Sequence, residues 1–321
     1  MSLPISAYQH GTYPRSEDVV AATRGLERGR TGPGEVADAF RRDLEDFVAV
    51  QRDAGLDLYS DGLLRWQDLF RPLVDATPGL EARTLVRWFD NNSFFRAPEP
   101  SGDLALVQPL PEVYLDDDSV PAPRVATLPS PYLFSRAAQH AGDRNALMMD
   151  LTREILAPVG RALVERSYEV IHLQEPWLAY FGIENEDWAD FEKALTEIRE
   201  SLPEGVALVL HVYFGDARPH LDRLRRMPVH ALGVDLVETD PDSLGSGWDI
   251  GLLTGALDGR SSLMEDPSEV AAFLRRIAEQ VQPPALYVSS NSDLELLPRD
   301  LAAQKVRTLG AVATQLRNDL W

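Results

Sequence analysis

The amino-acid sequence predicts an α/β protein, a (β/α)8 barrel of the TIM type with an insertion after the second strand. Eight short β-rich runs, each closing on polar residues, are spread along a chain of 321 residues. Helical segments lie between several of them, and strands that alternate with helices indicate a parallel sheet. Eight such units in this length favour one closed barrel domain over residues 1–321, and the glycine-rich phosphate loops of nucleotide-binding folds are absent.

The strands are predicted from short apolar runs that end in polar residues or turn signals. In chain order they span residues 5–14, 56–62, 124–131, 169–176, 206–214, 231–239, 249–259 and 285–293. Each is short enough for one wall segment of a barrel.

The intervening helices are predicted from apolar residues at helical spacing. Residues 34–55 show this spacing and end at Gly55, and residues 150–168 and 266–281 behave likewise. Pro158 is expected to kink the second of these helices.

Residues 64–123 do not follow this alternation. They are rich in proline and contain the aromatic stretch RWFDNNSFFRAPEP. We expect this segment to be an insertion that packs over one end of the barrel.

Composition excludes several classes of function. The formal net charge of −20 and the pI near 4.7 disfavour binding to nucleic acids and anionic membranes. There are no cysteines, so disulfides and thiolate-bound zinc or iron–sulfur clusters supplied by this chain are impossible. No apolar run is long enough for a membrane span, and no secretory signal is recognisable, so we expect a cytoplasmic protein. The acidity suits either a high-salt habitat or an ordinary acidic protein.

Polar residues close most of the predicted strands. In a barrel the carboxyl ends of the strands converge on one mouth, where sites form. The residues expected there are His10, Asp61, Gln174, Glu175, His211, Tyr213, Asp216, Glu238, Asp258, Asn291, Ser292 and Asp293.

Several of these residues have both a catalytic and a structural interpretation. Glu175 precedes a proline that restrains its backbone, so it is a candidate general base or a structural hydrogen-bond acceptor. Asp61, followed by Gly62, is a candidate catalytic acid or a turn residue. Tyr213 is a donor to an oxyanion or a packed ring, and His211 is a metal ligand or a donor to a neighbouring oxygen.

Aromatic residues are concentrated in the predicted insertion. A planar substrate such as a pterin could stack on them, or they could form the core of a lid. They are Trp66, Trp88, Phe89, Phe94 and Phe95, of which Trp66 is our candidate for substrate binding.

Phrases along almost the whole chain resemble the cobalamin-independent methionine synthase family, whose barrels are related to uroporphyrinogen decarboxylase. They include VQRDAGLDLYSDGLLRWQDLF, LPSPYLFSRAA, EVIHLQEPWLA, LVLHVYFGD, GVDLVETD, IGLLTGALDGRSSLMEDPSEV and SSNSDLELLPRDLAAQKVRTLGA. The resemblance implies methyl transfer from a methyl-folate to homocysteine, with the thiol activated by a zinc ion that one His, two Cys and one Glu hold. RWFDNNSFFRAPE is more similar to the zinc-free N-terminal barrel of the two-barrel enzymes.

The resemblance assigns candidate metal ligands residue by residue. It places His211 and Glu238 at two of the family's four zinc positions, while Tyr213 and Ser292 stand where the family has cysteines. Zinc is therefore possible only with substitute ligands, and Asp216 or Asp293 could supply an oxygen.

The amino-acid pocket of the family is altered as well. Gln174 stands where the family's Asp holds the substrate amine, and Leu63 replaces a second amine-binding residue. The resemblance leaves Gln174, Tyr213, Asn291 and Ser292 as candidate substrate-binding residues. Glu175, Asp61 and Asp216 are the candidate catalytic residues.

Three functions remain open at this point. The first is a methyltransferase that uses a methyl-folate or related pterin and methylates homocysteine or a related thiol, without any further organic cofactor. The second is a non-catalytic barrel that docks on a separate zinc-bearing barrel subunit. The third is a metal-free lyase or decarboxylase that works through Asp and Arg residues.

Overall fold

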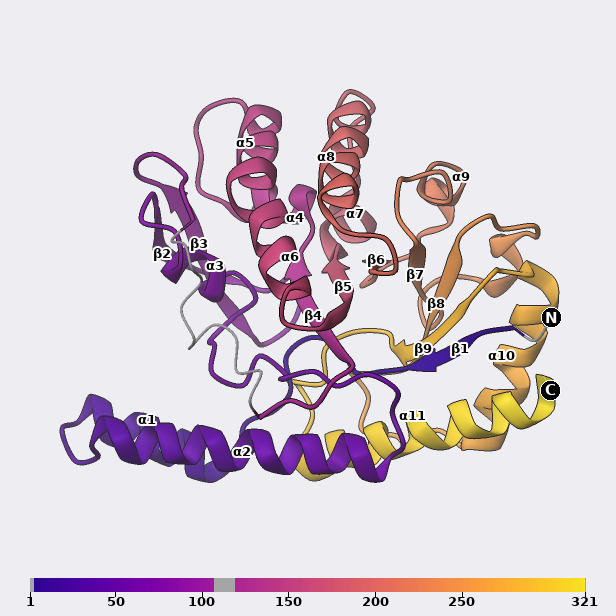
Figure 1. Cartoon of the computed structure of the whole chain (residues 1–321), viewed down its shortest axis with the longest axis horizontal. Helices are drawn as coiled ribbons and strands as arrows, with labels where there is room; N and C mark the ends of the chain where they lie inside the picture. Colours follow the sequence, from indigo (N-terminus) through magenta and orange to yellow (C-terminus); the bar gives the residue numbers. More distant parts are fainter. Residues whose placement is uncertain (1–2, 107–118, 321) are drawn as a thin grey trace.

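A computed structural model describes residues 3–106 and 119–320, and a parallel sheet forms its centre (Figure 1). The sheet has seven strands in the order β1-β9-β8-β7-β6-β5-β4, and every neighbouring pair for which a register is given is parallel. The strands are β1 (Ile5–Ala7), β4 (Arg124–Pro129), β5 (Tyr168–Gln174), β6 (Ala207–Val212), β7 (Ala231–Asp235), β8 (Gly251–Leu257) and β9 (Leu286–Ser290).

The prediction of a β-strand at residues 56–62 is wrong, although this segment occupies the position of the eighth barrel strand, between β1 and β4. Only Tyr59 forms a bridge, to Arg124. Asp57 N donates to the Ala7 carbonyl at 2.9 Å and Tyr59 N to the Pro123 carbonyl at 3.0 Å, so the segment links β1 to β4. It does not extend further because the Gln51 side chain bonds both the N–H and the carbonyl of Ser60.

Helices cover the outside of the sheet (Figure 1). They are α1 (Glu17–Glu27), α2 (Pro33–Asp53), α3 (Arg71–Asp75), α4 (Pro131–Ala137), α5 (Arg144–Leu151), α6 (Ala157–Val164), α7 (Pro176–Phe181), α8 (Asp187–Ser201), α9 (Leu221–Leu224), α10 (Pro267–Val281) and α11 (Arg299–Leu320). Short 3-10 turns span Arg218–His220 and Pro241–Leu244, and a π-helical turn spans Thr152–Leu156.

The predicted helices are confirmed, with one change of geometry. α2 and α10 match residues 34–55 and 266–281 closely. The segment at 150–168 is broken into α5, the π-helical turn and α6, and the irregular turn lies just before Pro158. This break agrees with the expected effect of a proline that lacks an N–H donor.

Residues 64–123 contain α3 and an antiparallel hairpin of β2 (Leu80–Arg87) and β3 (Phe94–Pro100). The hairpin forms a separate two-stranded sheet. Part of the predicted insertion, residues 107–118, lies outside the described residues. The origin of this segment as an insertion stays a prediction.

A membrane-spanning helix was not predicted. None of the helices in the described ranges has the length and apolar character that a membrane span requires.

Candidate active site

The interior of the barrel is arranged in layers, because alternate residues of a strand face the same side. The lowest layer is apolar and consists of Tyr8, Leu58, Val125, Val170, Val209, Ala231 and Leu253. Two residues further along their strands, His172 and His211 lie above Val170 and Val209. Another two residues on come Gln174 and Tyr213, at the carboxyl ends of β5 and β6. The strands thus pass from an apolar floor to imidazoles and then to a polar mouth.

Asp293 is the centre of the hydrogen bonds at this mouth. Its Oδ1 accepts from Thr12 N at 2.7 Å and from Gln174 Nε2 at 2.9 Å, and its Oδ2 accepts from the Tyr213 hydroxyl at 3.5 Å. Gln174 Nε2 also lies 3.2 Å from His10 Nδ1, so the network continues down to the histidines. Asp293 thereby joins segments that are far apart in the sequence.

Glycine is required where the backbone approaches this network. Gly11 has a φ of +73°, and a Cβ there would lie 1.7 Å from Asp293 Oδ1 and 2.6 Å from Gln174 Nε2. At Gly233 on β7 a Cβ would come within 2.7 Å of the His211 ring. Neither position can accept a side chain without moving the polar groups beside it.

A pocket opens beside Asp293, between the strand ends and the hairpin. It combines carboxyl groups with aromatic side chains and is lined by Thr12, Gln67, Asp68, Leu69, Trp88, Ser93, Phe94, Phe95, Gln174, Asp293 and Glu295. The aromatic residues also form a core of their own, since the Phe70 ring lies 6.0 Å from Trp88 and 5.1 Å from Phe95. Trp88, Phe94 and Phe95 thus line the pocket, and Trp88 and Phe95 also pack against Phe70. Stacking of a planar substrate on these rings stays a prediction.

The pKa values of three carboxyl groups in this pocket are raised. Burial raises the pKa of Asp293. Burial, and then the charge of Asp293, raise the pKa of Glu295 to about 7. Burial also raises the pKa of Asp68, although three backbone N–H groups oppose the shift. Acids of this kind can donate a proton near neutral pH.

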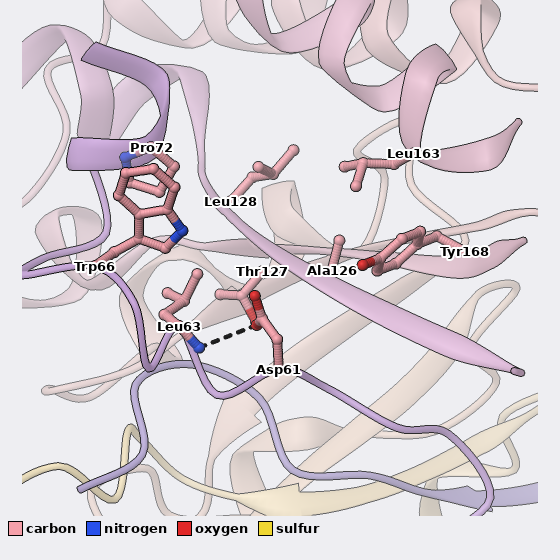
Figure 2. A pocket seen from close by; sticks show the side chains of 9 residues that line it. All are labelled: Asp61, Leu63, Trp66, Pro72, Ala126, Thr127, Leu128, Leu163 and Tyr168. Carbon is pink, nitrogen blue, oxygen red and sulfur yellow. Dashed lines mark hydrogen bonds between the residues drawn. The ribbon is translucent and has the colours of Figure 1, made fainter. Parts of the chain in front are cut away.

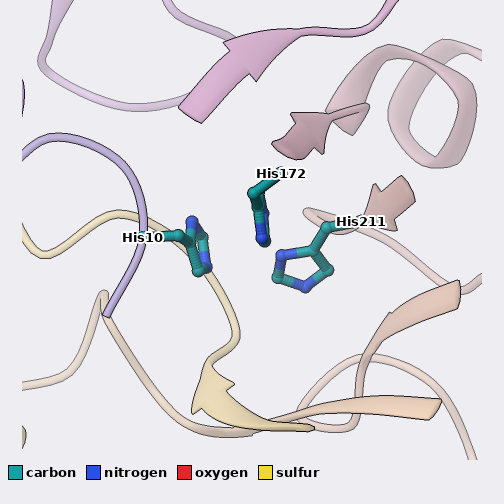
Figure 3. A group of neighbouring side chains, drawn as sticks. All are labelled: His10, His172 and His211. Carbon is teal, nitrogen blue, oxygen red and sulfur yellow. The ribbon is translucent and has the colours of Figure 1, made fainter. Parts of the chain in front are cut away.

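Below the mouth, three buried histidines form a close group (Figure 3). His10, His172 and His211 each offer a ring nitrogen, and these nitrogens lie within 4.8 Å of one another. His10 Nε2 lies 3.2 Å from the Ser290 carbonyl, and His172 Nδ1 lies 3.0 Å from the Tyr8 hydroxyl. His172 Nε2 and both nitrogens of His211 have no hydrogen-bond partner. His10 and His211 were expected at the mouth from their places at strand ends, and His172 was not among the predicted site residues.

The three imidazoles are neutral in this environment. Burial lowers the pKa of His10 to about 4. Burial, followed by the neighbouring imidazoles, lowers the pKa of His172 and of His211 well below the ordinary value. Neutral imidazole is the form that can offer a lone pair.

Glu175 serves as a structural cap. It is fully buried, and its carboxylate accepts from Leu178 N at 2.8 Å, from Leu133 N at 3.0 Å and from the Ser130 hydroxyl. It therefore holds the first turns of α7 and α4 together. Its role as a general base stays a prediction, and its contacts favour the structural interpretation.

The cap gives a test of pH dependence through a Glu175→Gln variant. Burial raises the pKa of Glu175 to about 7, from 4.5. The stabilising effect of this raised pKa is complete below pH 4.5 and is lost as the pH rises through 7. The free energy of unfolding of the variant, measured by urea titration, should therefore rise relative to that of the wild type by up to about 3 kcal/mol over this range. If the difference in the free energy of unfolding between the variant and the wild type does not change with pH, the raised pKa of Glu175 is contradicted.

Asp61 and Trp66 lie in a different pocket, at the end of the segment 56–62 that had been predicted as a strand (Figure 2). Its other lining residues are Leu63, Pro72, Ala126, Thr127, Leu128, Leu163 and Tyr168. Asp61 Oδ1 accepts from Leu63 N at 3.0 Å, which is the turn interaction expected of an Asp–Gly pair. The two residues line one pocket, but it is not the pocket at Asp293.

Two other predicted residues lie toward the surface. Asp216 accepts from Arg218 N and forms an ion pair with the same arginine at 3.0 Å. Glu238 is exposed and does not belong to the histidine group. The chain turns outward before Glu238 because Asp235 Oδ1 accepts from Val237 N and Glu238 N.

Asp235 is the buried carboxyl group that the sequence analysis missed. It faces inward at the end of β7, and Asn291 Nδ2 donates to it at 3.1 Å. Burial raises its pKa to about 6. Asn291 and Ser292 are both buried, and the Ser292 hydroxyl lies 3.2 Å from Asn291 Oδ1. The structure therefore uses both residues as internal polar contacts next to Asp293.

The residues at the four zinc positions implied by the resemblance do not fit a zinc ion. The hydroxyl of Tyr213 is directed to Asp293, and burial raises its pKa well above 10. The Ser292 hydroxyl is engaged by Asn291, and Glu238 is exposed. Of these four residues, only His211 offers a buried ligand atom without a hydrogen-bond partner, whereas zinc needs three or four protein ligands.

An α/β fold with a seven-stranded parallel sheet, consistent with a TIM-like barrel, is the class of protein that this architecture defines. Residues 76–282 match the profile of the cobalamin-independent synthase N-terminal domain. The chain belongs to the cobalamin-independent methionine synthase family.

Individual relatives agree with this membership. The methionine synthase of Sulfolobus acidocaldarius is 27% identical over 306 residues, which cover 92% of this chain and 87% of that protein. The 5-methyltetrahydropteroyltriglutamate–homocysteine methyltransferase of Herpetosiphon aurantiacus is 28% identical over 240 residues, which cover 73% of this chain and 31% of that longer protein.

Solved structures share the fold. A B12-independent methionine synthase from Shewanella sp. W3-18-1 superposes with a TM-score of 0.76 at 17% identity, covering 100% of this chain and 99% of that one. The putative vitamin-B12 independent methionine synthase from Listeria monocytogenes gives 0.78 at 16% identity, with the same coverage.

Proposed function

We propose that the chain is a methyltransferase that passes a methyl group from a methyl-folate or related pterin to homocysteine or a related thiol. The observation that carries this proposal is the pocket at Asp293, in which carboxyl groups with raised pKa values lie beside aromatic side chains. Aromatic faces suit a planar pterin ring, and carboxyl groups suit its N–H donors. Membership of the family and the names of its relatives support the same reaction.

The reaction explains why protonated acids are useful here. The bond between the methyl carbon and the pterin nitrogen breaks, and a bond from that carbon to the acceptor sulfur forms. The pterin nitrogen leaves more easily when it takes up a proton, and the sulfur attacks after it has lost one. We assign the proton donor to Glu295, because it lines the pocket and because burial, followed by the charge of Asp293, raises its pKa to about 7.

The test is a methyl-transfer assay with the purified chain alone. Methyl-tetrahydropteroyl-glutamate and homocysteine are supplied, and methionine is measured by mass spectrometry. We expect methionine at a rate well above that of the substrates without protein. Catalysis by this chain alone would be contradicted if the folded protein methylated neither homocysteine nor other small thiols faster than the substrates react without protein.

A second function, a partner barrel for a separate zinc-bearing subunit, is favoured by three observations. The matching profile is that of the N-terminal domain, and the residues at the family's zinc positions do not fit the metal. An exposed aromatic surface also lies on α7, where Tyr180 and Phe181 are 40% and 58% exposed and contact Phe89 of the hairpin region.

The two functions give different results in one experiment. A separately expressed barrel with the His-x-Cys motif and the distal Cys is added to the assay. Methionine formation that requires both chains, with co-elution of the two on a sizing column, would support the partner function. Equal rates with and without the added barrel would exclude it.

A further inference from the structure

The histidine layer has the features of a metal site that differs from the family's zinc site. His10, His172 and His211 come from three separate segments, and each is fully buried. Their ring nitrogens are within 4.8 Å of one another (Figure 3). Three nitrogen atoms of His172 and His211 lack any hydrogen-bond partner, which is costly for buried polar atoms unless a ligand engages them.

The ring contact of His172 matches that of a metal-bound histidine, whereas both ring nitrogens of His10 are engaged in hydrogen bonds. A ligating imidazole usually donates its second N–H to an oxygen, which fixes its orientation. Gln174 Nε2 is a donor, so His10 Nδ1 accepts from it, and His10 Nε2–H donates to the Ser290 carbonyl. His172 Nδ1 can likewise donate to the Tyr8 hydroxyl, which leaves the Nε2 lone pair directed away from Tyr8.

We propose that His172 and His211, with His10 as the third ligand, bind one divalent transition-metal ion of the zinc type inside the barrel. Imidazole nitrogens suit zinc, cobalt, nickel and copper, and three of them leave at least one coordination position open. The apolar floor below the group excludes water from that side. The test of this site does not depend on the proposed methyl transfer, because it measures metal binding and not activity.

Binding requires a local rearrangement. Ligand nitrogens around one zinc ion are about 3.3 Å apart, so the separations of up to 4.8 Å must shorten. The His211 ring is perpendicular to the other two, at 85° and 89°, but His10 and His172 are stacked at 4.1 Å with a tilt of 12°. Two stacked rings cannot both direct in-plane lone pairs at one ion. His10 must therefore turn and give up its hydrogen bond from Gln174.

The experiment uses tag-free protein that has been stripped with a chelator, given one equivalent of Zn²⁺ or Co²⁺, and desalted. Elemental analysis should find about one bound ion per chain, and bound Co²⁺ should show the visible absorption of a nitrogen-ligated site. His172→Gln and His211→Gln should each lower the retained metal at least tenfold. His140→Gln, a histidine outside the group, should retain it.

Two further measurements keep the proposal testable if a variant folds poorly. Tyr8→Phe removes only the oxygen that orients His172 and should weaken Zn²⁺ binding about 10- to 100-fold, as other such contacts do. Zn²⁺ should raise the melting temperature of the wild type, which needs no variant. Folded wild-type protein that retains neither ion, or retention that is unchanged in folded His172→Gln and His211→Gln, would overturn the proposal.

Discussion

Gly11→Ala is expected to lower the free energy of unfolding by about 4 kcal/mol and to abolish substrate binding at the mouth. Gly11 has a φ of +73°, a left-handed conformation that costs an alanine about 1–2 kcal/mol. The new Cβ would also lie 1.7 Å from Asp293 Oδ1, so the carboxyl group has to leave its hydrogen bonds with Thr12 N and Gln174. Loss of these buried hydrogen bonds supplies the remainder.

Gly29→Ala is the matched control for this substitution. Gly29 has a similar φ of +66°, but nothing lies within 4 Å of a Cβ built there. It should therefore show only the conformational cost, about 1 kcal/mol. The comparison is made by chemical denaturation of the two variants and the wild type. Equal losses at Gly11 and Gly29 would show that the contact with Asp293 has no energetic importance.

Glu295→Gln is expected to lower kcat for methyl transfer about 100-fold, the usual contribution of a positioned acid. The raised pKa of Glu295, about 7, means that the acid is protonated below that pH and ionised above it. The wild-type rate should therefore be level below pH 7 and fall about tenfold for each unit above it. In the variant this alkaline decline should disappear, because glutamine does not titrate.

Glu204→Gln provides the control, since Glu204 is an exposed acid away from the pocket. Its rate and pH profile should equal those of the wild type. A Glu295→Gln enzyme that keeps the wild-type rate and the alkaline decline would remove Glu295 from the proton-transfer role. Loss of rate with unchanged KM and an unchanged melting temperature would support the role, because a folding defect would alter the melting temperature.

The general plan of the barrel could be predicted because short apolar runs that end in polar residues, and apolar residues at helical spacing, are local properties of the sequence. Seven of the eight predicted strands occur in the parallel sheet. The segment at 56–62 could not be judged locally, since its pairing ends where Gln51 captures the backbone of Ser60. That contact depends on how α2 lies against the sheet.

The site was predicted in part. The convergence of Gln174, Tyr213 and Asp293 followed from their places at strand ends, and in the structure these three side chains are joined by hydrogen bonds. His211 lies one layer below them, with its ring 5.1 Å from that of Tyr213. Strict alternation along EVIHLQ would also have found His172, two residues before Gln174 on the same face.

Glu238 was expected at the mouth because it closes the sixth predicted strand, and the resemblance gave it the role of a metal ligand. β7 pairs Gly233 with His211, so the next inward residue is Asp235, while Glu238 lies beyond the turn. Raised pKa values and unpartnered nitrogens could not be predicted, because they depend on burial by residues from other parts of the chain.

The most direct test of the account is a crystal structure of the chain with methyl-tetrahydropteroyl-glutamate. We predict that the pterin ring lies in the pocket at Asp293, in contact with Trp88 or Phe94 and within hydrogen-bond distance of Asp293 or Glu295. A pterin bound instead beside Asp61 and Trp66, or no bound pterin at saturating concentration, would contradict the assignment of the mouth as the methyl-donor site.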